Sequence, residues 1–134
     1  STAVRVYAQA SGQDMEMDDS VQVLITYADG STASIAYLAR SHAQLPKEYF
    51  MVSSGGETAS CENFKTTRIL GGKDVKHINQ DKGQATAVKA FIESVRTGSA
   101  SPFTVEEILS TSKVTFGILE SIRTNDSVTL GPGR

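Results

Sequence analysis

The apolar positions of this chain change their spacing once, shortly after residue 80. Before that point, apolar and polar residues tend to alternate in short runs, which is the period-two pattern of half-buried strands. After it, apolar residues recur every three or four positions over two long stretches, which is the spacing of one face of a helix. This order, with strands first and helices second, predicts an α+β domain.

Turn residues divide the strand-like part into short segments. The apolar positions over residues 21–27 are followed by Asp29-Gly30 and a second run over 32–39, which predicts a hairpin with a type I′ turn. The run over residues 48–53 is rich in aromatic and apolar side chains and is expected to form a central strand. We expect a largely antiparallel, open-faced sheet, whose other strands cover residues 4–8, 58–62, 66–70, 75–78 and 127–130.

Two helices are expected after residue 80. The first has Asp81 and Gln84 at the spacing of a capping box and ends at Gly98. The second has the same spacing between Thr104 and Glu107. We expect both helices to pack on one face of the sheet, with their apolar stripes, including Phe91 and Phe116, in the core.

Charge and composition exclude several classes of protein. The 134 residues carry a net charge of −2, and acidic residues interrupt the densest lysine run, so a nucleic-acid partner is not expected. No segment approaches the roughly 20 apolar residues of a membrane span. The only cysteine, Cys61, cannot form an internal disulfide, and residues 1–10 do not resemble a signal peptide. These features predict a single cytoplasmic domain over residues 1–134.

No catalytic or cofactor signature stands out. The glycine pairs Gly55-Gly56 and Gly71-Gly72 lie between expected strands, whereas dinucleotide binding needs a glycine-rich turn between a strand and a helix. His42, His77 and Cys61 lack the close spacing of metal ligands. We therefore expect no catalytic residue, no cofactor-binding residue and no metal ligand in this chain.

Three polar residues are the candidates for a binding role. Lys47 opens the expected strand over residues 48–53, and Gln80 and Lys82 flank the start of the first helix. Residues at the ends of elements often contact ligands. The alternative is that all three are ordinary surface residues.

Four segments, taken in order, resemble a known family. They are YADGSTASIAYLA, LPKEYFMVSSGGETASCENF, NQDKGQATAVKAFIESVRTG and TFGILESIRT, and together they span nearly the whole chain. The chain resembles the C-terminal domain of the Gfo/Idh/MocA oxidoreductases, which include glucose–fructose oxidoreductase and inositol dehydrogenase. Within that family it is most similar to dehydrogenases linked to sugar and heteropolysaccharide metabolism.

The resemblance implies a division of labour with a second domain. An N-terminal Rossmann domain of the same parent protein would hold NAD or NADP, whereas this domain would shape the substrate pocket with Lys47, Gln80 and Lys82. The open sheet would form a homodimer or a larger homo-oligomer. The family's E-K-P motif and D-x-x-x-H helix are not found in this sequence, so the resemblance predicts a fragment that is inactive alone. The alternative is a free-standing binding or assembly module with the same fold.

Overall fold

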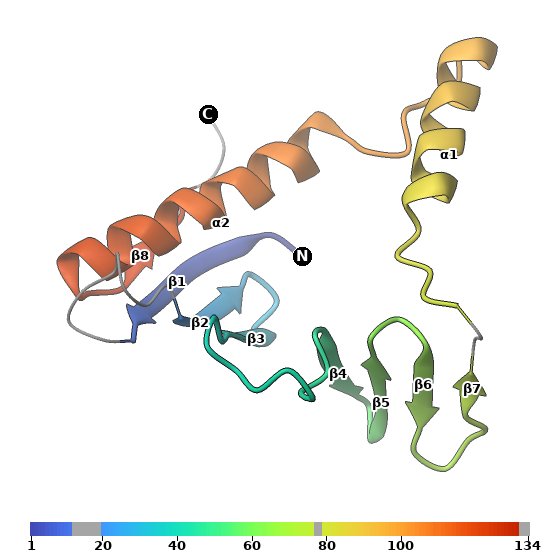
Figure 1. Cartoon of the computed structure of the whole chain (residues 1–134). Coiled ribbons are helices and arrows are strands. Elements are labelled where there is room, and N and C mark those ends of the chain that lie inside the picture. Colours follow the sequence, from blue (N-terminus) through green and yellow to red (C-terminus); the bar gives the residue numbers. More distant parts are fainter. Residues whose placement is uncertain (12–19, 77–78, 132–134) are drawn as a thin grey trace. The chain divides into compact units, whose positions relative to one another are not determined.

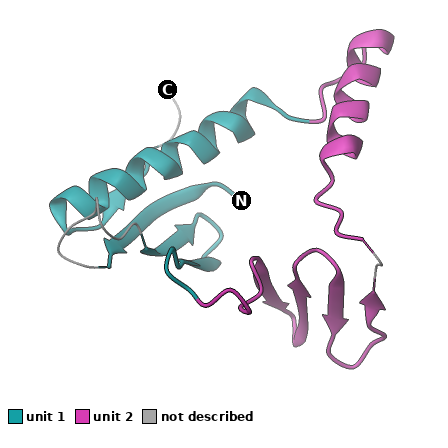
Figure 2. Ribbon diagram, viewed as in Figure 1, with its two compact units in different colours: residues 1–41, 103–134 teal, residues 42–102 magenta. Residues whose placement is uncertain are grey.

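The computed structural model describes residues 1–11, 20–76 and 79–131. The chain divides into two compact units, the first formed by residues 1–41 and 103–134 and the second by residues 42–102 (Figure 2). The strands form two antiparallel open sheets, one in each unit (Figure 1). The predicted α+β class with open antiparallel sheets is thereby confirmed, with the strands divided between two sheets.

The first sheet has the order β3-β2-β1-β8. Its strands are β1 (Ala3–Ala10), β2 (Val21–Tyr27), β3 (Thr32–Tyr37) and β8 (Val128–Thr129). The register between β1 and β2 shifts between Ala3 and Arg5. This irregularity lets Ala3 share the buried face with Val6 and Ala8, although strict alternation would place Ala3 on the opposite face.

The predicted hairpin joins β2 and β3, but its turn is not type I′. Gly30 has a φ of 84°, whereas Asp29 is not among the residues with positive φ. A type I′ turn needs positive φ at both central residues, so this loop is better described as a type I turn followed by one left-handed residue. The Asp29 carboxylate supports the turn by accepting hydrogen bonds from the backbone N–H and the hydroxyl of Ser31.

One helix, α2 (Val105–Thr124), packs on β1 and β8. The buried core consists of Ala3, Val6, Ala8, Val23 and Ile25. Three partly buried helix residues, Val114, Ile118 and Ile122, pack against this core.

Two small residues of α2 are the ones most deeply placed. Gly117 and Ser121, one turn apart, are buried. A Cβ added at Gly117 would lie 2.9 Å from the Val6 Cγ1 atom, which shows how close the helix backbone comes to β1. Phe116 is 69% exposed, so the prediction that places it in the core is wrong. The helix is rotated so that Gly117 and Ser121 permit the close approach, and Phe116 and Leu119 face outward.

The second sheet has the order β4-β5-β6-β7. Its strands are β4 (Tyr49–Ser54), β5 (Glu57–Glu62), β6 (Thr66–Ile69) and β7 (Val75–Lys76). The segment predicted as a central strand, β4, is instead an edge strand. The predicted continuation of β7 over residues 77 and 78 lies outside the described residues.

The second unit also contains α1 (Gln84–Thr97), which ends at the left-handed Gly98 as predicted. The predicted capping box between Asp81 and Gln84 is not formed. The helix begins after Gly83, and Asp81 accepts a hydrogen bond from the backbone N–H of Gly83 instead. Phe91 is 48% exposed, so its predicted place in the core is wrong. Within the described residues of the second unit, α1 has no extensive contact with a strand, so the expected packing of a helix on a sheet face is seen for α2 and not for α1.

Neither helix has the length and apolar character needed to cross a membrane, within the residues that the structure describes.

Candidate functional site

Gln80 and Lys82, two of the three predicted site residues, meet on one carboxylate in the second unit. The Lys82 ammonium forms an ion pair with the Oε1 atom of Glu48. The Gln80 side-chain amide lies 3.5 Å from the Oε2 atom of Glu48 and donates a shorter hydrogen bond of 2.8 Å to the backbone carbonyl of Asn63. Gln80 and Lys82 are 32 and 34 positions from Glu48 in the sequence. These contacts hold the segment before α1 against the start of β4.

The partner of Glu48 is a turn with unusual backbone geometry. Asn63 and Phe64, between β5 and β6, both have positive φ, of 51° and 53°. This region is uncommon for residues other than glycine, and a bulky side chain rarely adopts it. Two hydrogen bonds hold the turn in place: Asn63 N donates to the Glu48 carbonyl at 2.7 Å, and Glu48 N donates to the Asn63 side chain at 3.1 Å.

The turn directs the Phe64 ring toward two neighbours. Its centroid lies 5.5 Å from that of Phe50, and the Lys82 Nζ atom lies over the ring at 5.9 Å from the centroid. Phe50 and Phe64 line a cavity of about 340 Å³, together with Cys61, Thr67 and Asp81. This volume is near the lower limit for small-molecule sites. The cavity combines an apolar, aromatic lining with a carboxylate.

The charges of this cluster act on Glu48. The hydrogen bond from Lys82 holds the pKa of the Glu48 carboxyl below its ordinary value, and the positive charges of Lys82 and Lys47 add to the effect. Glu48 is therefore ionised at neutral pH, and it neutralises the ammonium that it holds.

The third predicted residue, Lys47, is exposed. Among the described residues it makes no side-chain hydrogen bond or ion pair, and it acts on Glu48 only through its charge. The structure thus brings Gln80 and Lys82 together but, among the described residues, does not join the Lys47 side chain to them.

Sequence reasoning missed Glu48, Asn63 and Phe64, which complete the cluster. Positive φ at two neighbouring residues that are not glycine has no signature in the sequence. The contact between Glu48 and Lys82 joins residues 34 positions apart, which local patterns do not predict. The one available signal was the position of Glu48 immediately after Lys47 at the start of a strand.

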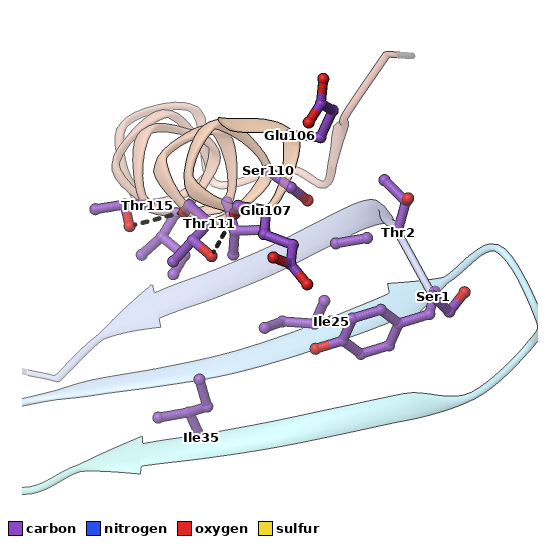
Figure 3. Close-up of a pocket in the computed structure, with 13 residues that line it drawn as sticks. Ser1, Thr2, Ile25, Ile35, Glu106, Glu107, Ser110, Thr111 and Thr115 are labelled. Atoms are coloured by element: carbon purple, nitrogen blue, oxygen red, sulfur yellow. Dashed lines mark hydrogen bonds between the residues drawn. The ribbon is translucent and has the colours of Figure 1, made fainter. Parts of the chain in front are cut away.

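A second cavity, of about 590 Å³, lies in the first unit between α2 and the sheet (Figure 3). Ile25 and Ile35 rise from the strands, and Glu107, Ser110, Thr111 and Thr115 come from the helix (Figure 3). The cavity therefore has an apolar floor beneath a row of polar side chains.

The polar groups of this second cavity are largely used by the helix itself. The Thr111 and Thr115 hydroxyls donate to the backbone carbonyls of Glu107 and Thr111, one turn earlier. Glu107 forms the predicted capping box with Thr104, and these bonds hold its pKa below the ordinary value. In the cluster at Glu48, by contrast, the lysine and the glutamine bind side chains and a turn and are not used by a helix backbone. This cluster is therefore the better candidate for a polar ligand.

The glycine-rich turns do not fit a dinucleotide. The left-handed Gly55 and Gly56 connect β4 to β5, and Gly71 follows β6. None of these turns leads from a strand into a helix, as a pyrophosphate site requires. No group of three potential metal ligands occurs within the described ranges, which do not include His77.

The fold is shared with solved oxidoreductases. The chain is similar to an aldose-aldose oxidoreductase from Caulobacter crescentus, with a TM-score of 0.73 and 19% identity over 96% of this chain and 42% of that protein. An NAD binding oxidoreductase from Klebsiella pneumoniae gives a TM-score of 0.80 and 13% identity over 98% and 46%. A myo-inositol dehydrogenase from Corynebacterium glutamicum gives 0.66 and 15% over 98% and 44%.

These solved structures are oxidoreductases of the Gfo/Idh/MocA type, so the resemblance seen in the sequence is confirmed at the level of the fold. In each case this chain spans less than half of the length of the other protein. Neither a protein-family model nor a curated protein sequence matches the chain.

Proposed function

We propose that this chain is the substrate-binding and oligomerisation domain of an NAD(P)-dependent sugar or cyclitol dehydrogenase, and that it is not catalytic alone. The observation that carries the proposal is the joining of Gln80 and Lys82 beside Phe64, a residue that lines the aromatic cavity, within a fold found in sugar and inositol oxidoreductases.

The chemistry of the cluster suits a polyhydroxylated ring. Hydroxyl groups both donate and accept hydrogen bonds, so a site for them combines ammonium or amide donors with carboxylate or amide acceptors. Lys82 and Gln80 supply donors, and Glu48 and Asp81 supply acceptors. The rings of Phe50 and Phe64 offer apolar surface to the C–H groups of a sugar. Lys47, which is exposed beside Glu48, is proposed as a third contact.

The rest of the enzyme is proposed to be an N-terminal Rossmann domain of the same parent protein. That domain would bind NAD or NADP, which when bound accepts a hydride from the substrate. The role of this chain would be to hold the hydroxyl groups of the substrate in one orientation. A fixed orientation of the reacting groups accounts for much of the rate enhancement of an enzyme. Its sheet would also carry the contact between subunits.

A titration of the ¹⁵N-labelled 134-residue chain with myo-inositol and glucose, followed by NMR, tests the substrate site. We expect saturable shifts of the Gln80 and Lys82 amide signals in the wild-type chain. In Gln80→Ala we expect the binding affinity to fall about five-fold or more. Gln22→Ala, which removes the same side chain from an exposed position in β2, is the matched control. Shifts that persist unchanged in Gln80→Ala, or no shift with either compound, would contradict the proposed site.

A further inference from the structure

We propose that Glu48 determines the charge specificity of this site, so that it accepts a neutral polyhydroxylated ring and rejects sugars that carry a phosphate or a carboxylate. The inference rests on the proposed substrate site at Gln80 and Lys82. It adds a residue with a defined role and narrows the class of substrate.

The pairing of Lys82 is the first argument. Lysine is a common partner for phosphate and carboxylate groups, but here its ammonium is bound to Glu48. Both side chains are mostly shielded from solvent, with exposed fractions of 31% for Lys82 and 27% for Glu48. An anionic ligand would have to displace the Glu48 carboxylate or lie beside it. In the second case the two negative charges would repel each other.

A second carboxylate, that of Asp81, lies just before α1. It accepts a hydrogen bond of 2.8 Å from the backbone N–H of Gly83. Asp81 also lines the cavity, so it would face the ligand with a negative charge.

The positive charge of Lys82 is therefore not available to an anionic ligand. Lys82 is paired with Glu48, and Asp81 adds a carboxylate to the lining of the cavity. The cavity presents two phenylalanine rings, a threonine and a carboxylate, a combination that hydrogen-bonds hydroxyl groups and covers C–H surface. A neutral ring gains both kinds of contact without the repulsion that an anion would meet.

The test compares four probes by NMR titration of the 134-residue chain at fixed ionic strength: glucose and myo-inositol as neutral rings, glucuronate and glucose 6-phosphate as anionic ones. We expect the wild-type chain to bind the neutral probes at least about five-fold more tightly. Glu48→Gln keeps the shape of the side chain and frees the Lys82 charge, and we expect it to raise the affinity for the anionic probes about five-fold relative to the neutral ones.

Glu57→Gln is the matched control, because Glu57 is an exposed carboxylate on the same sheet and has no ion pair among the described residues. Equal or tighter binding of the anionic probes by the wild-type chain would overturn the inference. So would an affinity ratio in Glu48→Gln that matches the ratio in Glu57→Gln. Equal or tighter binding of the anionic probes by the wild-type chain refutes the inference even where Glu48→Gln disturbs the turn at Asn63.

Gln80→Ala separates this inference from the proposed function. If that variant weakens all four probes while Glu48→Gln leaves their ratio unchanged, the site stands and the role of Glu48 is refuted. If Gln80→Ala leaves every titration unchanged, or if no probe binds, the proposed site and the role of Glu48 are both refuted.

Discussion

The hydroxyl of Ser121, in the last turn of α2, accepts a hydrogen bond of 2.8 Å from the backbone N–H of Ala8 in β1. β8 pairs with β1 only at Arg5 and Val6, so Ala8 lies beyond the end of that pairing. The same hydroxyl donates at 2.6 Å to the carbonyl of Asp126, in the turn that leads to β8. One completely buried side chain thus replaces a strand partner for β1 and fixes the chain reversal after α2.

Ser121→Ala should therefore destabilise the first unit. The substitution leaves the buried N–H of Ala8 without an acceptor, and such a loss costs about 1–3 kcal/mol. Urea denaturation followed by circular dichroism measures the change. Ser112→Ala is the control, because Ser112 lies on the same helix, is exposed and bonds only to its own helix backbone, at Ile108. A Ser121→Ala variant as stable as the control would refute the role of this hydroxyl.

Gly117→Ala should also destabilise the chain, although alanine has the higher helix propensity. The gain in propensity is about 1 kcal/mol. Against it, the new Cβ would lie 2.9 Å from Val6 Cγ1 and 2.7 Å from Leu130 Cδ2. Val6 is buried and stiff, so relief requires the helix to move, and overpacking of this kind costs about 1–3 kcal/mol.

The double variant Gly117→Ala/Leu130→Ala identifies the source of that loss. Removing the Leu130 side chain makes room on one side of the new methyl group, so the two substitutions should cost less together than the sum of their separate effects. A Gly117→Ala variant more stable than wild type would show that α2 can move away from β1 at little cost.

Glu107 should make the start of α2 sensitive to acid. The backbone N–H and the hydroxyl of Thr104 donate to its carboxylate at 3.0 and 2.9 Å, which lowers its pKa from the ordinary value of 4.5. A group whose pKa is lowered on folding stabilises the folded state fully above its ordinary pKa. That stabilisation is lost as the pH falls through the lower, folded-state value.

We therefore expect the free energy of unfolding to decline less between pH 6 and about pH 3 in Glu107→Gln than in the wild-type chain. Unfolding by urea at several pH values gives the two curves, and their difference isolates this group from the other carboxylates. Glu106→Gln is the control, since Glu106 makes none of the capping hydrogen bonds among the described residues. Parallel curves for the wild-type chain and Glu107→Gln would contradict the prediction.

Local signals in the sequence predicted most of the elements. The alternation of apolar residues placed β2, the Thr104 and Glu107 pair placed the start of α2, and Gly98 placed the end of α1. These features depend on residues close together in the chain, where turn and cap chemistry is decisive.

The packed face of α2 could not be predicted in the same way. The apolar stripe that contains Phe116 predicts a buried face there, but the helix packs through the face that carries Gly117, Ile118 and Ser121. Which stripe is buried depends on the shape of β1 and on hydrogen bonds to Ala8, and neither is encoded within the helix. The cluster around Glu48 depends in the same way on contacts distant in sequence and on a left-handed turn at Asn63.

The apolar stripe of α2 predicts that removing the Phe116 side chain destabilises the fold. Because Phe116 is exposed in the structure, we expect the opposite, a small effect on stability. Phe116→Ala should change the free energy of unfolding by no more than about 0.5 kcal/mol, as is usual for exposed side chains. Ile118→Ala, two residues away but packed on the core, should cost about 2 kcal/mol. Thermal or urea unfolding of both variants checks this order. A larger loss for Phe116→Ala would mean that its stripe is covered in solution.

The last prediction is that the chain self-associates through the face of the first sheet that lies away from α2. On that face Leu24 is 51% exposed and pairs across the strands with Tyr7, which is 38% exposed. Large exposed apolar residues that are neighbours favour a contact between protein surfaces, and a two-fold dimer is the commonest closed arrangement. Light scattering at micromolar concentrations should give a mass above the 14.3 kDa of one chain.

Leu24→Glu should lower that mass toward 14.3 kDa, because each dimer would bury two carboxylates without partners. Phe116→Glu places the same charge on α2, which packs on the opposite face of that sheet, and should leave the mass unchanged. A wild-type mass of 14.3 kDa at every concentration would exclude self-association. If Phe116→Glu dissociates the chain and Leu24→Glu does not, then the exposed stripe of α2, and not the sheet, forms the contact.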